Sequence, residues 1–188
     1  SMHPLKNLNV WGDGGIVVTN SKKMFSKISL LRNHGLRNRD VCEIFAYNSR
    51  LDTLQAIVGL HLFKKIDAIT NKRIENAKYF DNKLSSIPQV NIPIRLKSAK
   101  QVYHIYVIKV KDRDKLQSFL IDKNIDAKVH YPIPMHLQPA SKFLNYKEGD
   151  FPKAEDTCKN VLSLPVHEFI SKSECDYVIN SIKEFYKC

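Results

Sequence analysis

One lysine near the start of the chain stands in a setting where its amine could act as a nucleophile. Lys6 lies in the short polar stretch Ser1–Leu8, which contains a proline, and the glycine-rich turn Gly12–Gly15 and the β-branched residues 16–19 follow it. Removing a lysine ammonium from water favours the neutral amine, which attacks carbonyl groups and forms a Schiff base. The pattern indicates a Schiff-base lysine, and the alternative is an ordinary solvated surface charge.

Two other loops carry polar side chains of kinds that bind anions or sugars. Asn48 and Arg50 lie in a turn-forming stretch, where an amide can donate to a phosphate oxygen and an arginine can serve a structural ion pair or an anion contact. Residues 130–138 read HYPIPMHLQ, and the two prolines stiffen this loop, which is either a rigid surface connector or the rim of a pocket. No set of histidine, cysteine and carboxylate residues has zinc spacing, so no metal site is expected.

The pattern of apolar residues predicts the elements that must position these side chains. Residues 16–19 read as a short buried strand, and a helix capped at Asn20 or Ser21 follows it and ends near Gly35. Helices are also expected at Thr53–Lys65, which is apolar on most sides, and at Ala68–Ser85.

A small α/β unit is expected after a break near Pro88. Its predicted elements are a strand at residues 101–110, a helix from Asp112 to about Asn124, a strand at residues 125–130 and a final helix that starts at the capping box Ser171–Glu174.

Six stretches together resemble the nucleotide-sugar aminotransferases of the DegT/StrS type, which depend on pyridoxal 5′-phosphate. The lysine segment departs from that family's usual pattern at Met2, which stands in place of an aromatic residue, and at Asn9, which stands in place of a glycine. The resemblance runs in the family's order through essentially the whole chain. Its stretches are Ser1–Gly15, Arg32–Gly35, Tyr47–Leu51, Gln55–Ala56, His130–Pro132 and Leu162–Pro165.

The resemblance implies an α/β fold that is the C-terminal portion of a fold-type-I pyridoxal-phosphate-dependent transferase. Residues 1–90 would form the end of the large cofactor-binding domain with its interface helices, and residues 91–188 a small α/β C-terminal domain. In the family, the N-terminal half supplies the groups that hold the cofactor ring, so this chain alone is expected to be an inactive fragment that binds the cofactor weakly. Lys6 also lies near the start of the chain, where segments are poorly ordered unless they are tied down.

The resemblance further implies a role for particular residues in making deoxyamino sugars or polysaccharides. Lys6 would bond to the cofactor and move protons, Ser1 would contact the cofactor phosphate, and Asn48 would reach the phosphate held by the neighbouring subunit of a homodimer. Glutamate would be the amino donor, and lysine at position 6 favours transamination over a related dehydratase branch that carries histidine there. The pocket for a nucleoside-diphosphate keto sugar, in a form typical of dTDP-linked substrates, would be bordered by His130, Tyr131 and His136.

Composition bounds the remaining alternatives. The formal net charge of +11 would suit a nucleic-acid partner, but the basic residues are spread along the chain without interleaved stacking aromatics, so none is expected. There is no membrane-length apolar run, no visible signal peptide and no paired cysteine spacing, so a cytoplasmic protein with reduced thiols and no membrane partner is expected. A non-catalytic structural or dimerisation fragment and a basic nucleic-acid-binding module remain alternatives. Ser1 and Met2 could also be remnants of a tag.

Overall fold

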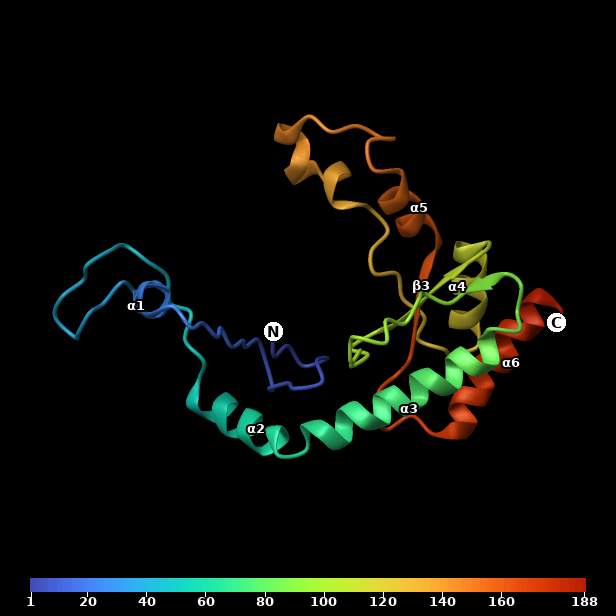
Figure 1. The fold of residues 1–188 in the computed structure, drawn as a ribbon, viewed down its shortest axis with the longest axis horizontal. Helices are drawn as coiled ribbons and strands as arrows, with labels where there is room; N and C mark the ends of the chain where they lie inside the picture. Colours follow the sequence, from blue (N-terminus) through green and yellow to red (C-terminus); the bar gives the residue numbers. More distant parts are fainter. The chain divides into compact units, whose positions relative to one another are not determined.

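The computed structural model describes residues 1–188 and contains two compact units, Ser1–Asp67 and Ala68–Cys188. The first unit is mostly loop, with two helices, α1 (Lys22–Leu31) and α2 (Thr53–Phe63), as Figure 1 shows in blue and teal. The helix α3 (Ile66–Leu84) begins at the end of this unit and belongs almost entirely to the second. The domain boundary after residue 90 that the sequence suggests for the whole protein stays a prediction.

The start of α1 follows the sequence prediction, whereas its end comes earlier than predicted. The Ser21 hydroxyl accepts the Met24 backbone N–H at 3.3 Å and caps the first turn. At the other end the Gly35 N–H donates to the Leu30 carbonyl at 2.8 Å, with Gly35 in the left-handed region at φ +70°. A Cβ at Gly35 would lie 1.6 Å from the Ile44 carbonyl oxygen, so only glycine fits here. The helix itself ends at Leu31, four residues before Gly35, and Gly35 closes the turn that follows it.

The start of α2 is also confirmed. The Asp52 carboxylate accepts the Leu54 backbone N–H at 2.8 Å as the N-terminal cap. The helix ends at Phe63, two residues before the predicted end. Within it, Gly59 is buried, and a Cβ there would lie 3.4 Å from the Val10 side chain of the N-terminal loop. This close approach is what joins α2 to the loop that carries Lys6.

The predicted buried strand at residues 16–19 is wrong. No strand forms there, and the side chains of Ile16, Val17 and Val18 are 62%, 70% and 86% exposed. A strand needs a neighbour to accept and donate its backbone hydrogen bonds, and no segment of this chain pairs with these residues. The β-branched run therefore stays unpaired and uncovered within these 188 residues.

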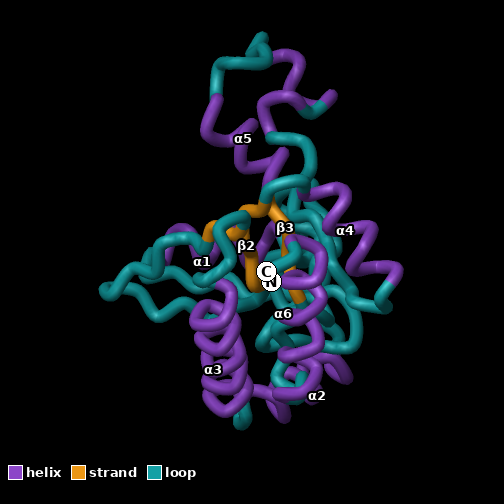
Figure 2. The backbone as a smooth tube through the Cα atoms, turned by 90° about the vertical axis from the view of Figure 1, so that its right-hand side faces the viewer, coloured by secondary structure: helices purple, strands orange, loops and turns teal.

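The second unit contains one small antiparallel sheet with helices around it. Tyr106 pairs with Leu164 and Ile108 with Leu162, and Figure 2 marks the three strands in orange. The strands β1 (Val90–Asn91), β2 (Tyr106–Val110) and β3 (Val161–Leu164) lie in this order across the sheet, and both neighbouring pairs are antiparallel. None of the helices is both long and apolar enough to span a membrane. After α3 the elements are β1 (Val90–Asn91), β2 (Tyr106–Val110), α4 (Arg113–Asp122), the 3₁₀ helices η1 (Met135–Leu137) and η2 (Pro139–Leu144), α5 (Pro152–Asn160), β3 (Val161–Leu164) and α6 (Lys172–Tyr186).

The core of the second unit lies between this sheet and three helices. Alternate residues of β2 are buried, as expected for a strand with one face on a core, whereas every residue of β3 is buried. The helices α4 and α6 lie side by side, and the Phe119 and Phe185 rings meet between them at 5.4 Å. The helical side chains buried most completely are Phe80 and Leu84 of α3, Leu116 and Leu120 of α4, and Cys175 and Ile182 of α6.

Polar side chains of α3 connect this helix to the rest of the unit. The Arg73 guanidinium forms an ion pair with Glu168 at 3.0 Å and donates to the carbonyl oxygens of Tyr103 and His104. Both members of the ion pair are largely buried, with side chains 9% and 16% exposed. A buried charge is tolerated only when it is paired and hydrogen-bonded, and Arg73 meets both conditions.

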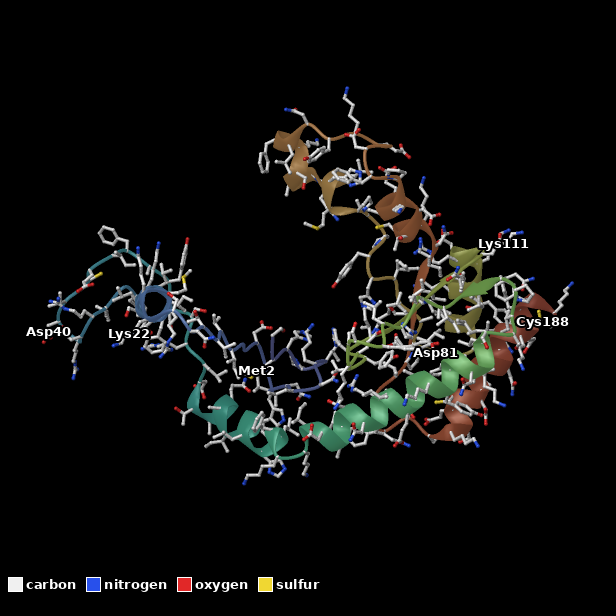
Figure 3. The ribbon with its side chains drawn as sticks, in the orientation of Figure 1. Met2, Lys22, Asp40, Asp81, Lys111 and Cys188 are labelled. Atoms are coloured by element: carbon white, nitrogen blue, oxygen red, sulfur yellow. The ribbon has the colours of Figure 1, made fainter.

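A second polar cluster centres on Asp81, which Figure 3 labels on α3. Its carboxylate accepts two hydrogen bonds from Arg95, at 3.1 and 2.9 Å, and a third from the Tyr106 hydroxyl at 2.7 Å. Burial raises the pKa of Tyr106, and the hydrogen bond to Asp81 raises it further, so the phenol stays neutral. The cluster fixes the loop before β2 against α3.

The sequence predictions for the second unit are confirmed for helices and partly wrong for strands. The capping box of α6 is present, with the Ser171 hydroxyl and the Glu174 carboxylate bonded to each other's backbone N–H groups. The strand predicted at residues 101–110 is confined to β2. The strand predicted at residues 125–130 is reduced to one bridge, between Lys128 and Ser163, on the edge of β3 that does not pair with β2.

Candidate active site

The loop that carries Lys6 is closed on itself by backbone hydrogen bonds. The Met2 N–H donates to the Gly14 carbonyl at 2.7 Å, and the Val10 N–H donates to the Met2 carbonyl at 3.0 Å. Met2, which Figure 3 labels, and Val10 are both buried. The segment around Lys6 was expected to be poorly ordered, but these backbone hydrogen bonds and the buried side chains hold it in place on both sides of Lys6.

Close packing holds this loop against the rest of the first unit. A Cβ at Gly14 would lie 2.9 Å from Val10 and 3.0 Å from Leu51, so a larger residue would displace the loop. The Gln55 side chain of α2 accepts the Trp11 backbone N–H at 2.7 Å. The glycine-rich turn and α2 together set where Lys6 stands.

Lys6 itself is half-buried, and no carboxylate pairs with it. Its backbone N–H donates to the His3 carbonyl at 2.8 Å, and its carbonyl accepts the Asn9 side-chain amide at 3.0 Å. The backbone is thus fixed while the side-chain amine remains available. Ser1 is exposed, and its hydroxyl accepts the His3 N–H at 3.3 Å. The chemical roles expected of Lys6 and Ser1 stay predictions.

A cavity of about 890 Å³ lies within the first unit, between residues 13–19, α1 and residues 47–51. Its lining combines apolar side chains, among them those of the unpaired residues 16 and 17, with two arginines. The apolar side chains are Ile16, Val17, Phe25 and Leu31, and the arginines are Arg32 and Arg50.

Asn48 lies beside this cavity with its amide oxygen already bonded. Arg50 donates to the Asn48 carbonyl oxygen at 3.1 Å and to that of Asn33 at 3.3 Å. Of the two roles that the sequence left open for Arg50, the ion pair is absent, because no carboxylate contacts it. Sequence reasoning missed Asn33 as a partner of Asn48. Both lie in stretches that carry the family resemblance, but nothing in their spacing shows that they meet.

The remaining predicted site residues lie in the second unit. His130 shares a hydrogen bond of 2.8 Å with the hydroxyl of Ser163 on β3, which fixes the imidazole ring. Tyr131 follows it with a side chain that is 70% exposed, its ring edge-on to His130 at 5.4 Å. The loop thus presents one accessible phenol on a fixed support. No observed contact links either residue to a substrate, so their binding roles stay predictions.

His136 is buried against an acidic residue that sequence reasoning missed. Its ring nitrogen lies 2.9 Å from Glu155 of α5, and both side chains are 8% exposed. The same carboxylate accepts the backbone N–H groups of Gly149 and Phe151. Burial raises the pKa of Glu155, but these two backbone bonds and the His136 ring outweigh it and hold the pKa below its ordinary value. Glu155 therefore holds both ends of residues 136–151, through the His136 ring and the backbone N–H groups of Gly149 and Phe151.

We expect acid to loosen this loop. A carboxylate with a depressed pKa in the folded state adds stability above its unfolded-state pKa, and this stability is lost as the pH falls through the folded-state value. Amide hydrogen exchange at Gly149 and Phe151 should therefore accelerate in acid relative to the core of α6. Glu155→Gln should show fast exchange already at neutral pH. Equal acid sensitivity in the variant and the wild type would contradict this assignment.

Comparison with known proteins relates the whole chain to sugar-modifying enzymes. The sequence profile described as the DegT/DnrJ/EryC1/StrS aminotransferase family matches residues 1–183. A pleiotropic regulatory protein of Geobacillus stearothermophilus is 36% identical over all of this chain and 51% of its own length. The dTDP-3-amino-3,4,6-trideoxy-alpha-D-glucose transaminase of Streptomyces venezuelae is 34% identical over 98% of this chain and 49% of its own length.

Solved structures give the same relationship in three dimensions. S. venezuelae DesV, determined in complex with a ketimine intermediate, superposes with a TM-score of 0.94 at 33% identity, over 100% of this chain and 50% of DesV. NtdA of Bacillus subtilis, determined with bound cofactor PMP, superposes with a TM-score of 0.87 at 25% identity, over 100% of this chain and 45% of NtdA. The chain therefore spans about half the length of the proteins it matches, and its fold is the corresponding portion of theirs.

Proposed function

Since this chain belongs to the DegT/DnrJ/EryC1/StrS aminotransferase family, we propose that it forms the C-terminal half of an enzyme that aminates a nucleotide-linked keto sugar. Glutamate is the proposed amino donor and a dTDP-linked keto-deoxyhexose the proposed acceptor. The observation that carries the proposal is the match of 98% of the chain to a dTDP-sugar transaminase in sequence and of the whole chain to DesV in fold.

The polar groups of the first unit fit pyridoxal phosphate. Lys6 offers an unpaired amine on a fixed backbone to the cofactor of its own subunit, and Asn48 offers amide N–H groups suited to the phosphate oxygens of the cofactor held by the neighbouring subunit. Bound there, the cofactor would supply an electron sink for the carbon that exchanges its amino group. Lys6 Nζ would carry a proton between that carbon and the cofactor C4′, which is a task for an amine held within hydrogen-bond reach of both atoms.

The loop at His130 and Tyr131 is proposed to face the sugar nucleotide. The Ser163 hydroxyl holds the His130 ring, and the exposed Tyr131 phenol can then donate to a sugar or phosphate oxygen. His136 is buried against Glu155 and is better placed to shape this loop than to touch a ligand. We therefore assign the direct contact to His130 and Tyr131 and a supporting role to His136.

The uncovered apolar surface of the first unit supports the view that the chain alone is incomplete. Besides residues 16–18, large side chains such as Trp11 and Phe45 are 83% and 103% exposed. Exposed apolar surface of this extent in one small unit marks a surface that another protein segment covers. The missing half of the enzyme and a second subunit are the proposed covers.

The test compares the 188-residue chain with the same chain joined to its N-terminal half. The joined protein should bind pyridoxal phosphate and aminate a dTDP-keto sugar with glutamate over many turnovers. The 188-residue chain should bind the cofactor weakly and show no turnover. Repeated turnover by the short chain would refute its incompleteness. A joined protein that is folded but inactive toward dTDP- and UDP-linked keto sugars would refute the function.

Self-association through α2 is expected of the joined protein. Leu54, Ile57, Leu60 and Phe63 follow one another at every third residue and are 74%, 58%, 67% and 61% exposed, so they form an apolar stripe that winds about half-way around α2 and has no partner in this chain. Leu60→Glu places a charge within that stripe and should convert a dimer to a monomer in sedimentation velocity. The control is Ile121→Glu on α4, an exposed apolar residue outside the stripe. A Leu60→Glu protein that stays dimeric would contradict the prediction.

A further inference from the structure

Two asparagines from distant stretches face each other in the first unit. Asn33, just after α1, and Asn48 form an isolated antiparallel bridge. The pair itself exchanges no backbone hydrogen bonds, and in such a pair the two side chains stand close together on the same face. Bonds of 2.9 and 2.8 Å join the flanking residues, His34 to Tyr47 and Ser49 to Arg32.

Arg50 bonds to both asparagines because it lies on their face of the bridge. It follows Asn48 by two residues, and residues two apart in extended chain project to the same side. Its Nε donates to the Asn48 oxygen and its Nη1 to the Asn33 oxygen. A guanidinium carries only donors, so each amide must turn its carbonyl oxygen toward Arg50. The orientation of both amides follows from this chemistry.

The consequence is a pair of amide NH₂ groups held side by side. Neither Asn33 nor Asn48 donates its side-chain N–H groups to an acceptor in the chain, and no carboxylate contacts the three residues. The Asn48 side chain is exposed, and that of Asn33 is half-buried. Convergent N–H donors next to an arginine are a setting for a phosphate group.

We infer that Asn33 and Asn48 together bind the cofactor phosphate and that Arg50 is the positioning residue that aims both amides at it. The inference rests on the proposed function, which assigns Asn48 to that phosphate. The inference adds Asn33 as a second hydrogen-bond donor to the phosphate. It also gives Arg50 the role of orienting the two amides without touching the phosphate itself. Since both donors lie in one unit, the pair acts as one preformed group toward the phosphate.

Asn33→Asp in the joined protein tests the second donor. The carboxylate still accepts the hydrogen bond from Arg50, but it replaces two N–H donors with an oxygen that repels phosphate. Affinity for pyridoxal phosphate should fall about tenfold or more, because hydrogen bonds to charged groups are the strong ones. Affinity for pyridoxal, which lacks the phosphate, should not change. Absorbance titrations measure both affinities without turnover.

Asn38→Asp is the matched control. It adds the same charge to the same unit, and its side-chain oxygen accepts the backbone N–H groups of Asp40 and Val41 at 3.0 and 2.9 Å, which a carboxylate accepts equally well. This variant should bind pyridoxal phosphate like the wild type.

Arg50→Ala tests positioning against direct contact. Alone, it should weaken pyridoxal phosphate binding several-fold and leave pyridoxal binding unchanged, because the amides lose their fixed orientation. In a protein that already carries Asn33→Ala and Asn48→Ala it should cause no further loss. A full additional loss there would mean that the guanidinium touches the phosphate and would overturn the positioning role.

Two further results would overturn the inference. Unchanged pyridoxal phosphate affinity in Asn33→Asp would remove Asn33 from the site. Equal losses for pyridoxal phosphate and pyridoxal would show a general structural role. If the wild-type joined protein binds neither compound, the proposed function fails as well, and this outcome is distinct from binding by a wild type whose variants do not differ.

Discussion

Lys6→Ala in the joined protein is expected to abolish transamination while the protein stays folded. The Lys6 amine is proposed to bond to the cofactor and to move the proton at the reacting carbon, and loss of a positioned acid–base group alone lowers rates by about 10²–10⁴-fold. The fold should survive because the loop is closed by backbone bonds of Met2, Val10 and Gly14, none of which involves the lysine side chain. Steady-state kinetics and circular dichroism measure the two parts of the expectation.

Two further variants make this result specific. Lys6→Arg keeps the positive charge but offers a group that stays protonated, so it should be as inactive as Lys6→Ala. Lys22→Ala removes an exposed lysine at the start of α1, in the same unit, and should keep normal turnover. Wild-type turnover by Lys6→Ala would remove this lysine from the mechanism.

Arg73→Ala should have the largest effect on stability. Removing one partner of a buried ion pair leaves the other charge without compensation, which costs about 3–5 kcal/mol. Here it would leave Glu168 inside the second unit without the guanidinium that lies 3.0 Å away. The free energy of unfolding, measured by urea denaturation, should fall by that amount, and the unfolding slope should stay the same if the unfolded state is unaffected.

Lys72→Ala is the control on the neighbouring residue of the same helix. Lys72 pairs with Glu75 at 3.6 Å, but both side chains are about half exposed or more, at 49% and 68%. Exposed pairs of this kind contribute about 0–1 kcal/mol. Comparable losses in Arg73→Ala and Lys72→Ala would show that burial of the Arg73 pair carries no special weight.

Helix ends were predictable from the sequence because the bonds that define them are local. Ser21, Asp52 and Ser171 each cap a helix through a backbone N–H two or three residues away. The α-helix that was missed, α5, begins at Pro152, and its N-cap residue Phe151 supplies no side-chain capping bond. Its buried face is centred on Glu155, a residue type that sequence patterns place outside a core.

Strands were less predictable because their hydrogen bonds go to other segments. Residues 16–19 and 125–130 both have the composition of strands. Residues 16–19 nevertheless have no partner strand in this chain, and residues 125–130 form only one bridge, to Ser163. Composition describes whether a segment suits a pleated surface and cannot describe whether a neighbour is present.

Some residues of the candidate site could be predicted from the sequence, and others could not. Lys6 and Asn48 were found through resemblance to a family, since a lone lysine or asparagine in a loop carries little information. Asn33 and Arg50 lie 17 residues apart and meet only in the folded unit. Glu155 was not predicted for a similar reason, because its partners His136 and Gly149 come from a single-turn 3₁₀ helix and a loop, which no periodicity describes.

The hydrogen bond between Gln55 and the backbone of Trp11 has a consequence for regulation. Gln55 belongs to the helix whose apolar stripe is the proposed subunit contact, and Trp11 to the loop that fixes Lys6. A change in how two subunits meet would therefore move the attachment point of the loop that carries Lys6. Activity per subunit of the proposed enzyme should therefore fall on dilution below the dimer dissociation constant, so that its specific activity depends on its own concentration.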